Sequence, residues 1–143
     1  MRYTKAFLAG ALSVLLFHQG AVALLYLIGA TARGPYEMNP TWPFGVPQVF
    51  SRAFWGGLWG IALWLVLERV RTPARYWALA VVLGILGPTL VAWFVVFPLR
   101  GRPIAGGWEY ATMLRAFVVN GAFGIGVAAL MRLFERPPPV RSG

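Results

Sequence analysis

Two stretches of this sequence share one pattern: RAFWGGLWGIALWLVL at residues 52–67 and RAFVVNGAFGIGVAALM at residues 115–131. Each begins with Arg-Ala-Phe, continues through glycine-x-aromatic-glycine-isoleucine, and carries no charge after its arginine. Each also closes a longer segment that opens on an Arg-Tyr pair, at residues 2–3 and 75–76. The repetition predicts two copies of one unit, a helical hairpin that crosses a membrane twice.

The composition is typical of membrane proteins. Of the 143 residues, 59% are hydrophobic and 12% are charged, and the mean hydropathy is +0.66. A soluble domain with so little polar surface would expose large apolar patches. The net charge of +9 does not indicate nucleic acid, because the basic residues stand at the ends of apolar runs. We therefore expect contact with the lipid bilayer and no nucleic-acid partner.

The apolar runs predict four membrane-spanning helices. A bilayer core needs about 20 helical residues, and residues 6–30 and 76–99 are uncharged runs longer than that. Two other runs are shorter, so their helices must extend past Arg52 and Arg115, whose side chains would reach back to the interface. Allowing for the uncertainty of helix ends, we expect helices at roughly residues 5–30, 47–69, 75–98 and 110–134.

The expected fold is an all-α integral membrane protein, one transmembrane domain over residues 1–143 built as two tandem helical hairpins. The first pseudo-repeat covers residues 1–71 and the second 72–136, followed by a short proline-rich tail at 137–143. Because each unit crosses twice, both copies enter the membrane in the same sense, as a parallel repeat. The second copy has one extra residue, which a π-bulge near residues 118–120 could absorb.

The distribution of Lys and Arg predicts the orientation. Five basic residues belong to one side, namely Arg33, Arg52, Arg100, Arg102 and Arg115, and eight to the other, namely Arg2, Lys5, Arg69, Arg71, Arg75, Arg132, Arg136 and Arg141. We therefore expect a multi-pass protein of a bacterial inner (plasma) membrane with both termini in the cytoplasm. The first run also resembles a secretory signal, but signal apolar regions are about 7–15 residues long, so we expect it to stay uncleaved.

Small residues on the second and fourth spans predict close helix packing, because helix association in lipid depends on backbone contact. Two interpretations stay open: packing of these two spans against each other within one chain, or a homo-oligomer interface. The residues concerned are Gly56, Gly57, Gly60, Gly121, Gly124 and Gly126. We further expect interface anchors at Arg52, Arg115, Trp42 and Trp108, since arginine and tryptophan favour the membrane boundary.

Three polar side chains fall near the middle of the spans: His18, Gln19 and Asn120. Polar groups in hydrocarbon are costly and usually face the bundle interior. They could pair helices through hydrogen bonds, or they could form a substrate or proton site, since histidine titrates near neutral pH. Of the four glutamates, Glu68 stands at the end of an expected span and the other three lie outside the spans, which leaves His18 as the one ionisable side chain at depth.

The residue inventory gives no basis for catalysis. A serine triad fails because the chain has one histidine and no aspartate, and a zinc site fails for want of ligands. We therefore expect no catalytic residues, no metal and no cofactor; haem could be bound only if His18 of two chains supplied both axial ligands. The expected function is a non-enzymatic accessory or scaffold subunit that packs against other membrane proteins. The alternative is a small homo-oligomeric pore or carrier whose path passes His18, Gln19 and Asn120.

Overall fold

The computed structural model describes residues 1–135 and contains four helices long and apolar enough to cross a membrane. They run over Arg2–Leu27, Gln48–Leu67, Pro73–Leu99 and Tyr110–Phe134. These bounds agree with the expected spans to within three residues at each end, because charged residues and prolines mark where the apolar runs stop. The expectation of an all-α, multi-pass membrane protein is confirmed at this level. Residues 136–143, which include Arg136, Arg141 and the predicted tail, lie outside the described part of the chain.

Two of the four spans are interrupted by a π-helical turn. The first consists of α1 (Arg2–Ser13), η1 (Val14–His18) and α2 (Gln19–Leu27), and the third of α4 (Pro73–Val91), η2 (Ala92–Val96) and α5 (Phe97–Leu99). The second and fourth spans are the uninterrupted helices α3 (Gln48–Leu67) and α6 (Tyr110–Phe134).

The π-bulge expected near residues 118–120 is therefore a wrong prediction, since α6 is regular there. The wide turns lie in the other two spans instead. For η2 the cause is Pro98, which follows it. Proline lacks a backbone N–H, and its ring would clash with the carbonyl four residues earlier. A wider turn relieves that clash.

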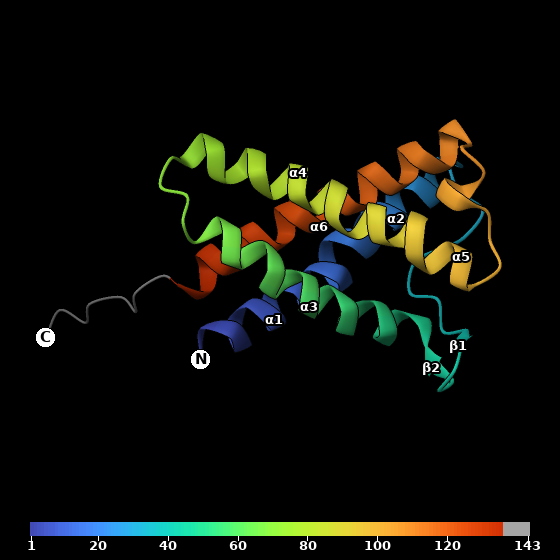
Figure 1. Ribbon diagram of the computed structural model, residues 1–143, viewed down its shortest axis with the longest axis horizontal. Helices are drawn as coiled ribbons and strands as arrows, with labels where there is room; N and C mark the ends of the chain where they lie inside the picture. Colours follow the sequence, from blue (N-terminus) through green and yellow to red (C-terminus); the bar gives the residue numbers. More distant parts are fainter. Residues whose placement is uncertain (136–143) are drawn as a thin grey trace, which may run out of the picture.

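The spans form a four-membered ring in which α3 packs on α1, α1 packs on α6, and α6 packs on α4. The ring closes between α3 and α4, which meet less extensively than the other neighbours (Figure 1). Large buried side chains between the helices include Leu63, Leu67, Phe123 and Met131. The most open side of the bundle is thus the one between α3 and α4.

The start of the first span and the end of the last lie at one end of the bundle, which we call the terminal end (Figure 1). There the Lys5 ammonium donates to the Phe134 carbonyl at 2.8 Å, and Arg2 pairs with Glu68 at 3.2 Å. The opposite, distal end carries the two connections that precede α3 and α6. The first contains a two-stranded hairpin of β1 (Pro40–Thr41) and β2 (Val46–Pro47), and the second a 3-10 turn, η3 (Ile104–Gly106).

Glycines bring the helix backbones together within each hairpin. A Cβ added to Gly10 would lie 2.1 Å from the Gly56 carbonyl oxygen and 2.8 Å from the Gly60 Cα. In the second hairpin, a Cβ on Gly84 would lie 2.6 Å from the Gly124 Cα. The glycines of α3 therefore face α1 and Gly124 of α6 faces α4, rather than α3 and α6 facing each other as one interpretation of the sequence held.

The start of α3 is linked to the first span through the connection 28–47. Its first turn lies beside Gln19, because Val49 N–H donates to the Glu37 carbonyl at 3.0 Å and the neighbouring Tyr36 N–H donates to Gln19 at 2.8 Å. Among the described residues α2 packs on α6, and no Cα of α2 lies within 8 Å of a Cα of α3. The first span and α3 therefore diverge toward the distal end. The connection 28–47 runs from the end of α2 to the start of α3 (Figure 1).

Candidate functional site

The three polar residues predicted at depth do not join one another. Asn120, on α6, donates from Nδ2 to Thr89 Oγ1 on α4 at 2.8 Å, and Thr89 is buried. Gln19, on α2, is also buried, but its partner comes from the connection 28–47. His18 has no hydrogen bond from its Nδ1 within residues 1–135. The Asn120–Thr89 bond links the two helices of one hairpin, as interhelical polar pairs do in membranes.

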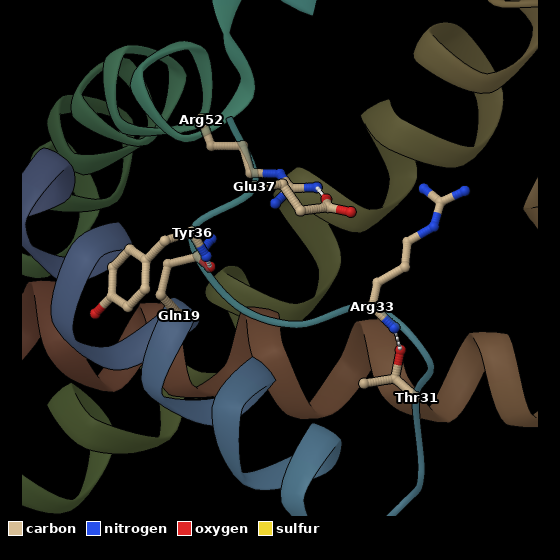
Figure 2. Close-up of polar contacts among 6 residues, drawn as sticks. All are labelled: Gln19, Thr31, Arg33, Tyr36, Glu37 and Arg52. Atoms are coloured by element: carbon tan, nitrogen blue, oxygen red, sulfur yellow. Dashed lines mark hydrogen bonds and ion pairs between the residues drawn. The ribbon is translucent and has the colours of Figure 1, made fainter. Parts of the chain in front are cut away.

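Tyr36 attaches the connection 28–47 to the middle of the first span. Its backbone N–H donates to Gln19 Oε1 at 2.8 Å (Figure 2). Its hydroxyl donates to the Leu15 carbonyl in η1, also at 2.8 Å. Tyr36 has a φ of 56°, a conformation that costs energy for a residue with a side chain and persists only when its surroundings hold it. The two hydrogen bonds to the first span keep Tyr36 in this conformation.

Glu37 and Arg52 form an ion pair next to Tyr36. The Arg52 Nη2 lies 3.0 Å from Glu37 Oε2, and the two side chains are 32% and 16% exposed (Figure 2). Gln48 bridges them in the amide orientation that satisfies both groups, with Nε2 donating to Glu37 at 2.8 Å and Oε1 accepting from Arg52 at 3.0 Å. The pair is therefore partly buried and hydrogen-bonded, which favours a defined geometry over a mobile surface contact.

We call these five residues the loop-lined cluster: Gln19, Tyr36, Glu37, Gln48 and Arg52. They join the first span, about two-thirds along its length, to the connection 28–47 and the start of α3. Non-helical backbone within a membrane is stable only where protein covers it or water reaches it. Hydrogen bonds within the cluster pair the Tyr36 N–H and the Glu37 carboxylate with the rest of the protein.

Two polar atoms, one in the cluster and one beside it, lack partners among the described residues. Gln19 Nε2 and His18 Nδ1 are both buried and make no hydrogen bond. An unpaired buried polar group costs about 1–3 kcal/mol, so each is a position where a bound molecule or water would lower the energy. The amide nitrogen can only donate, whereas the imidazole nitrogen donates or accepts according to its tautomer.

The sequence did not point to Tyr36, Glu37 or Gln48. The prolines and aromatics around them indicate a segment lying at the membrane boundary, whereas the structure places the Tyr36 hydroxyl against the middle of the first span and Glu37 against the start of α3. Arg52 lies one turn inside its helix as expected, but it binds Glu37. The one available signal was the pair of opposite charges at Glu37 and Arg52, which stand on either side of a proline-rich turn.

The other predicted residues are distributed as follows. Trp42 and Trp108 lie in the two distal connections, with 90% and 62% of their surface exposed. Arg115 lies near the start of α6 and donates from Nε to the Ala111 carbonyl at 3.0 Å. Within residues 1–135, no three His, Cys, Asp or Glu side chains gather as metal ligands would. The chain matches no family model, no curated protein and no solved structure.

Proposed function

We propose that this protein is a non-enzymatic accessory subunit that packs against another integral membrane protein through the open side of its bundle. The supporting observation is an apolar groove of about 250 Å³ between α3 and α4, the two neighbours that pack least closely. Its walls are Trp55, Leu58, Trp59, Ala62 and Val91. Two large aromatic side chains beside one small residue form a surface into which the side chains of a partner helix can pack.

The polar groups at depth support this proposal because most of them already bind the chain itself. Ser13 donates to the Phe123 carbonyl at 2.7 Å, Tyr76 to the Ala128 carbonyl at 2.9 Å, and Asn120 to Thr89 at 2.8 Å. Groups that hold helices together in this way are not available to conduct a polar substrate. In the same proposal, the protein resides in a bacterial inner membrane with the terminal end in the cytoplasm.

The proposal includes a duplicated architecture of two tandem hairpins. It is supported by matched backbone contacts in the two halves: Gly10 approaches Gly60 across α1 and α3, and Gly84 approaches Gly124 across α4 and α6. In each helix pair the glycine of the earlier helix follows an alanine by four residues, at Ala6 and at Ala80. The same small-residue spacing therefore serves the same contact twice.

Cross-linking from the groove tests the accessory role. A photo-reactive amino acid at Leu58, in the groove, should yield a product with a second membrane protein when activated in native membranes. The same group at Leu16, which is 58% exposed on the first span, serves as the control and should give lipid adducts only. Equal products from both positions, or lipid adducts alone from Leu58, would contradict the accessory role.

A homo-oligomeric pore or carrier is the second candidate, favoured by the unpaired His18 Nδ1 and Gln19 Nε2. For this function, cross-linking from Leu58 should join two copies of the chain, and proteoliposomes should show solute flux. That flux should fall on substitution His18→Ala, Gln19→Ala or Asn120→Ala. Flux that is absent, or that is indifferent to all three substitutions, would eliminate the pore or carrier.

A further inference from the structure

A second site, which shares no residue with the loop-lined cluster, lies at the distal end between the first span and α6. A cavity of about 260 Å³ opens there. Its lining is apolar except for one cation and consists of Leu25, Ala30, Ala111, Leu114, Val118 and Arg115. A guanidinium at the edge of an apolar cavity is a pattern that suits an amphiphile with an anionic group.

The Arg115 side chain retains unused hydrogen-bond donors. Its Nε donates to the Ala111 carbonyl within α6 at 3.0 Å. The two ion pairs among residues 1–135 are Arg2–Glu68 and Arg52–Glu37, so no described carboxylate neutralises Arg115. Its two Nη groups can therefore form the paired hydrogen bonds that arginine makes with carboxylate or phosphate.

Arg52 is the arginine that corresponds to Arg115 in the first copy of the repeated pattern. It begins the first Arg-Ala-Phe stretch and is neutralised by Glu37 from the preceding connection. The connection before the second stretch also supplies one acid, Glu109, but that carboxylate accepts a hydrogen bond from Thr112. Arg115 is thus left without the anion that Arg52 obtains from its own chain, and an anion from outside can take that place.

The shape of the cavity indicates a lipid rather than a free phosphate. Arg115 lies five residues after the start of α6, about 7 Å along the helix, which is a depth that phospholipid headgroups reach. Leu114 and Val118 continue the lining and are half-exposed on the outside of the bundle. An inorganic ion would leave this apolar wall uncovered, whereas an acyl chain would cover it.

We propose that this cavity binds one anionic phospholipid, with its phosphate on the Arg115 guanidinium and an acyl chain along Leu25, Leu114 and Val118. The site is independent of the accessory role proposed above. Arg115 serves here as a specific ligand, in contrast to the general attraction that any basic residue at a membrane surface exerts on anionic lipid.

Native mass spectrometry of the full-length protein in detergent tests the site. Phosphatidylglycerol should bind with one-to-one stoichiometry and more tightly than phosphatidylcholine. Arg115→Gln should weaken phosphatidylglycerol binding about tenfold, the loss expected when a charge-assisted hydrogen bond is removed, and should leave phosphatidylcholine unchanged. Val118→Trp, which fills the cavity from a lipid-facing position, should weaken both lipids. Arg100→Gln removes the same charge from an exposed position at the distal end and should change neither.

Three results would overturn the proposal. Equal losses for Arg115→Gln and Arg100→Gln would show general charge attraction, and unchanged binding in Val118→Trp would place the acyl chain elsewhere. Full competition by glycerol phosphate at the lipid's own concentration would show that the site recognises phosphate alone. Thermal unfolding of each variant in detergent monitors the fold, and Val118→Trp tests the cavity by itself if Arg115→Gln does not fold.

Discussion

At the scale of single residues, the fold depends on positions where no side chain is present. Gly10, Gly60, Gly84 and Gly124 lie where two helix backbones meet, and each has a backbone atom of the other helix less than 3 Å from where its Cβ would lie. Since apolar side chains gain nothing by leaving lipid for another apolar surface, this close approach is a main source of helix association in a membrane. Even one added methyl group should therefore separate the helices.

Gly10→Ala should lower the free energy of unfolding by about 2 kcal/mol, because its new Cβ would meet the Gly56 carbonyl oxygen and overpacking typically costs 1–3 kcal/mol. Gly20→Ala is the matched control: it lies on the same span with nothing within 4 Å. That control should be neutral or slightly stabilising, since alanine favours helix. Unfolding in detergent with increasing dodecyl sulfate measures both variants, and equal effects would contradict the packing described.

The sequence predicted these contacts in part. The paired glycines on α3 and α6 stand out by their number, whereas Gly10 and Gly84 are single glycines whose importance depends on the helix that faces them. The spacings Ala6 to Gly10 and Ala80 to Gly84 carry the missing signal. Sequence alone could not say that each pair meets its own hairpin partner, because small residues permit several pairings of equal quality.

At the scale of elements, the helices follow from the sequence and the connection 28–47 does not. Helix ends coincide with Pro47, Pro73 and the basic residues that flank the apolar runs, and these signals are local. The path of the connection depends on hydrogen bonds from Tyr36 to Gln19 and Leu15, which join residues far apart in sequence. The candidate site was also predicted only in part. The sequence singled out Gln19, but it did not indicate the residues that the fold brings next to it.

Tyr36→Phe should loosen the connection from the first span. The substitution removes the hydroxyl that binds the Leu15 carbonyl, a loss of about 1 kcal/mol. Amide hydrogen exchange in residues 31–46 should then become about fivefold faster, while exchange in α6 stays unchanged. Tyr26→Phe, at a half-exposed position on the same span, is the control and should have no effect. Equal exchange in both variants would mean that the hydroxyl does not hold this segment.

At the scale of the whole molecule, the ring of helices places the start and the end of the described chain at one end (Figure 1). The same end carries the turn between α3 and α4, and the distal end carries the other two connections. The arrangement fixes which segments share a side of the membrane. Whether that side is the cytoplasm depends on the distribution of arginines, which we use as a prediction.

Single cysteines test this arrangement directly, because the chain contains none of its own. Thr4→Cys and Thr72→Cys, at the terminal end, should react with a membrane-impermeant maleimide only from the cytoplasmic side of sealed vesicles. Met38→Cys, in the connection 28–47 and 59% exposed, should react only from the other side. Labelling of Thr4→Cys and Met38→Cys from one common side would contradict the four-span topology.

The divergence of the first span from α3 has a consequence for the surrounding lipid. Toward the distal end no Cα of α2 lies within 8 Å of a Cα of α3, and the connection 28–47, with the Glu37–Arg52 ion pair, lies beside the start of α3. Irregular chain and a charged pair offer neighbouring acyl chains less apolar surface than a regular helix does. The leaflet should therefore thin on this flank to relieve the hydrophobic mismatch.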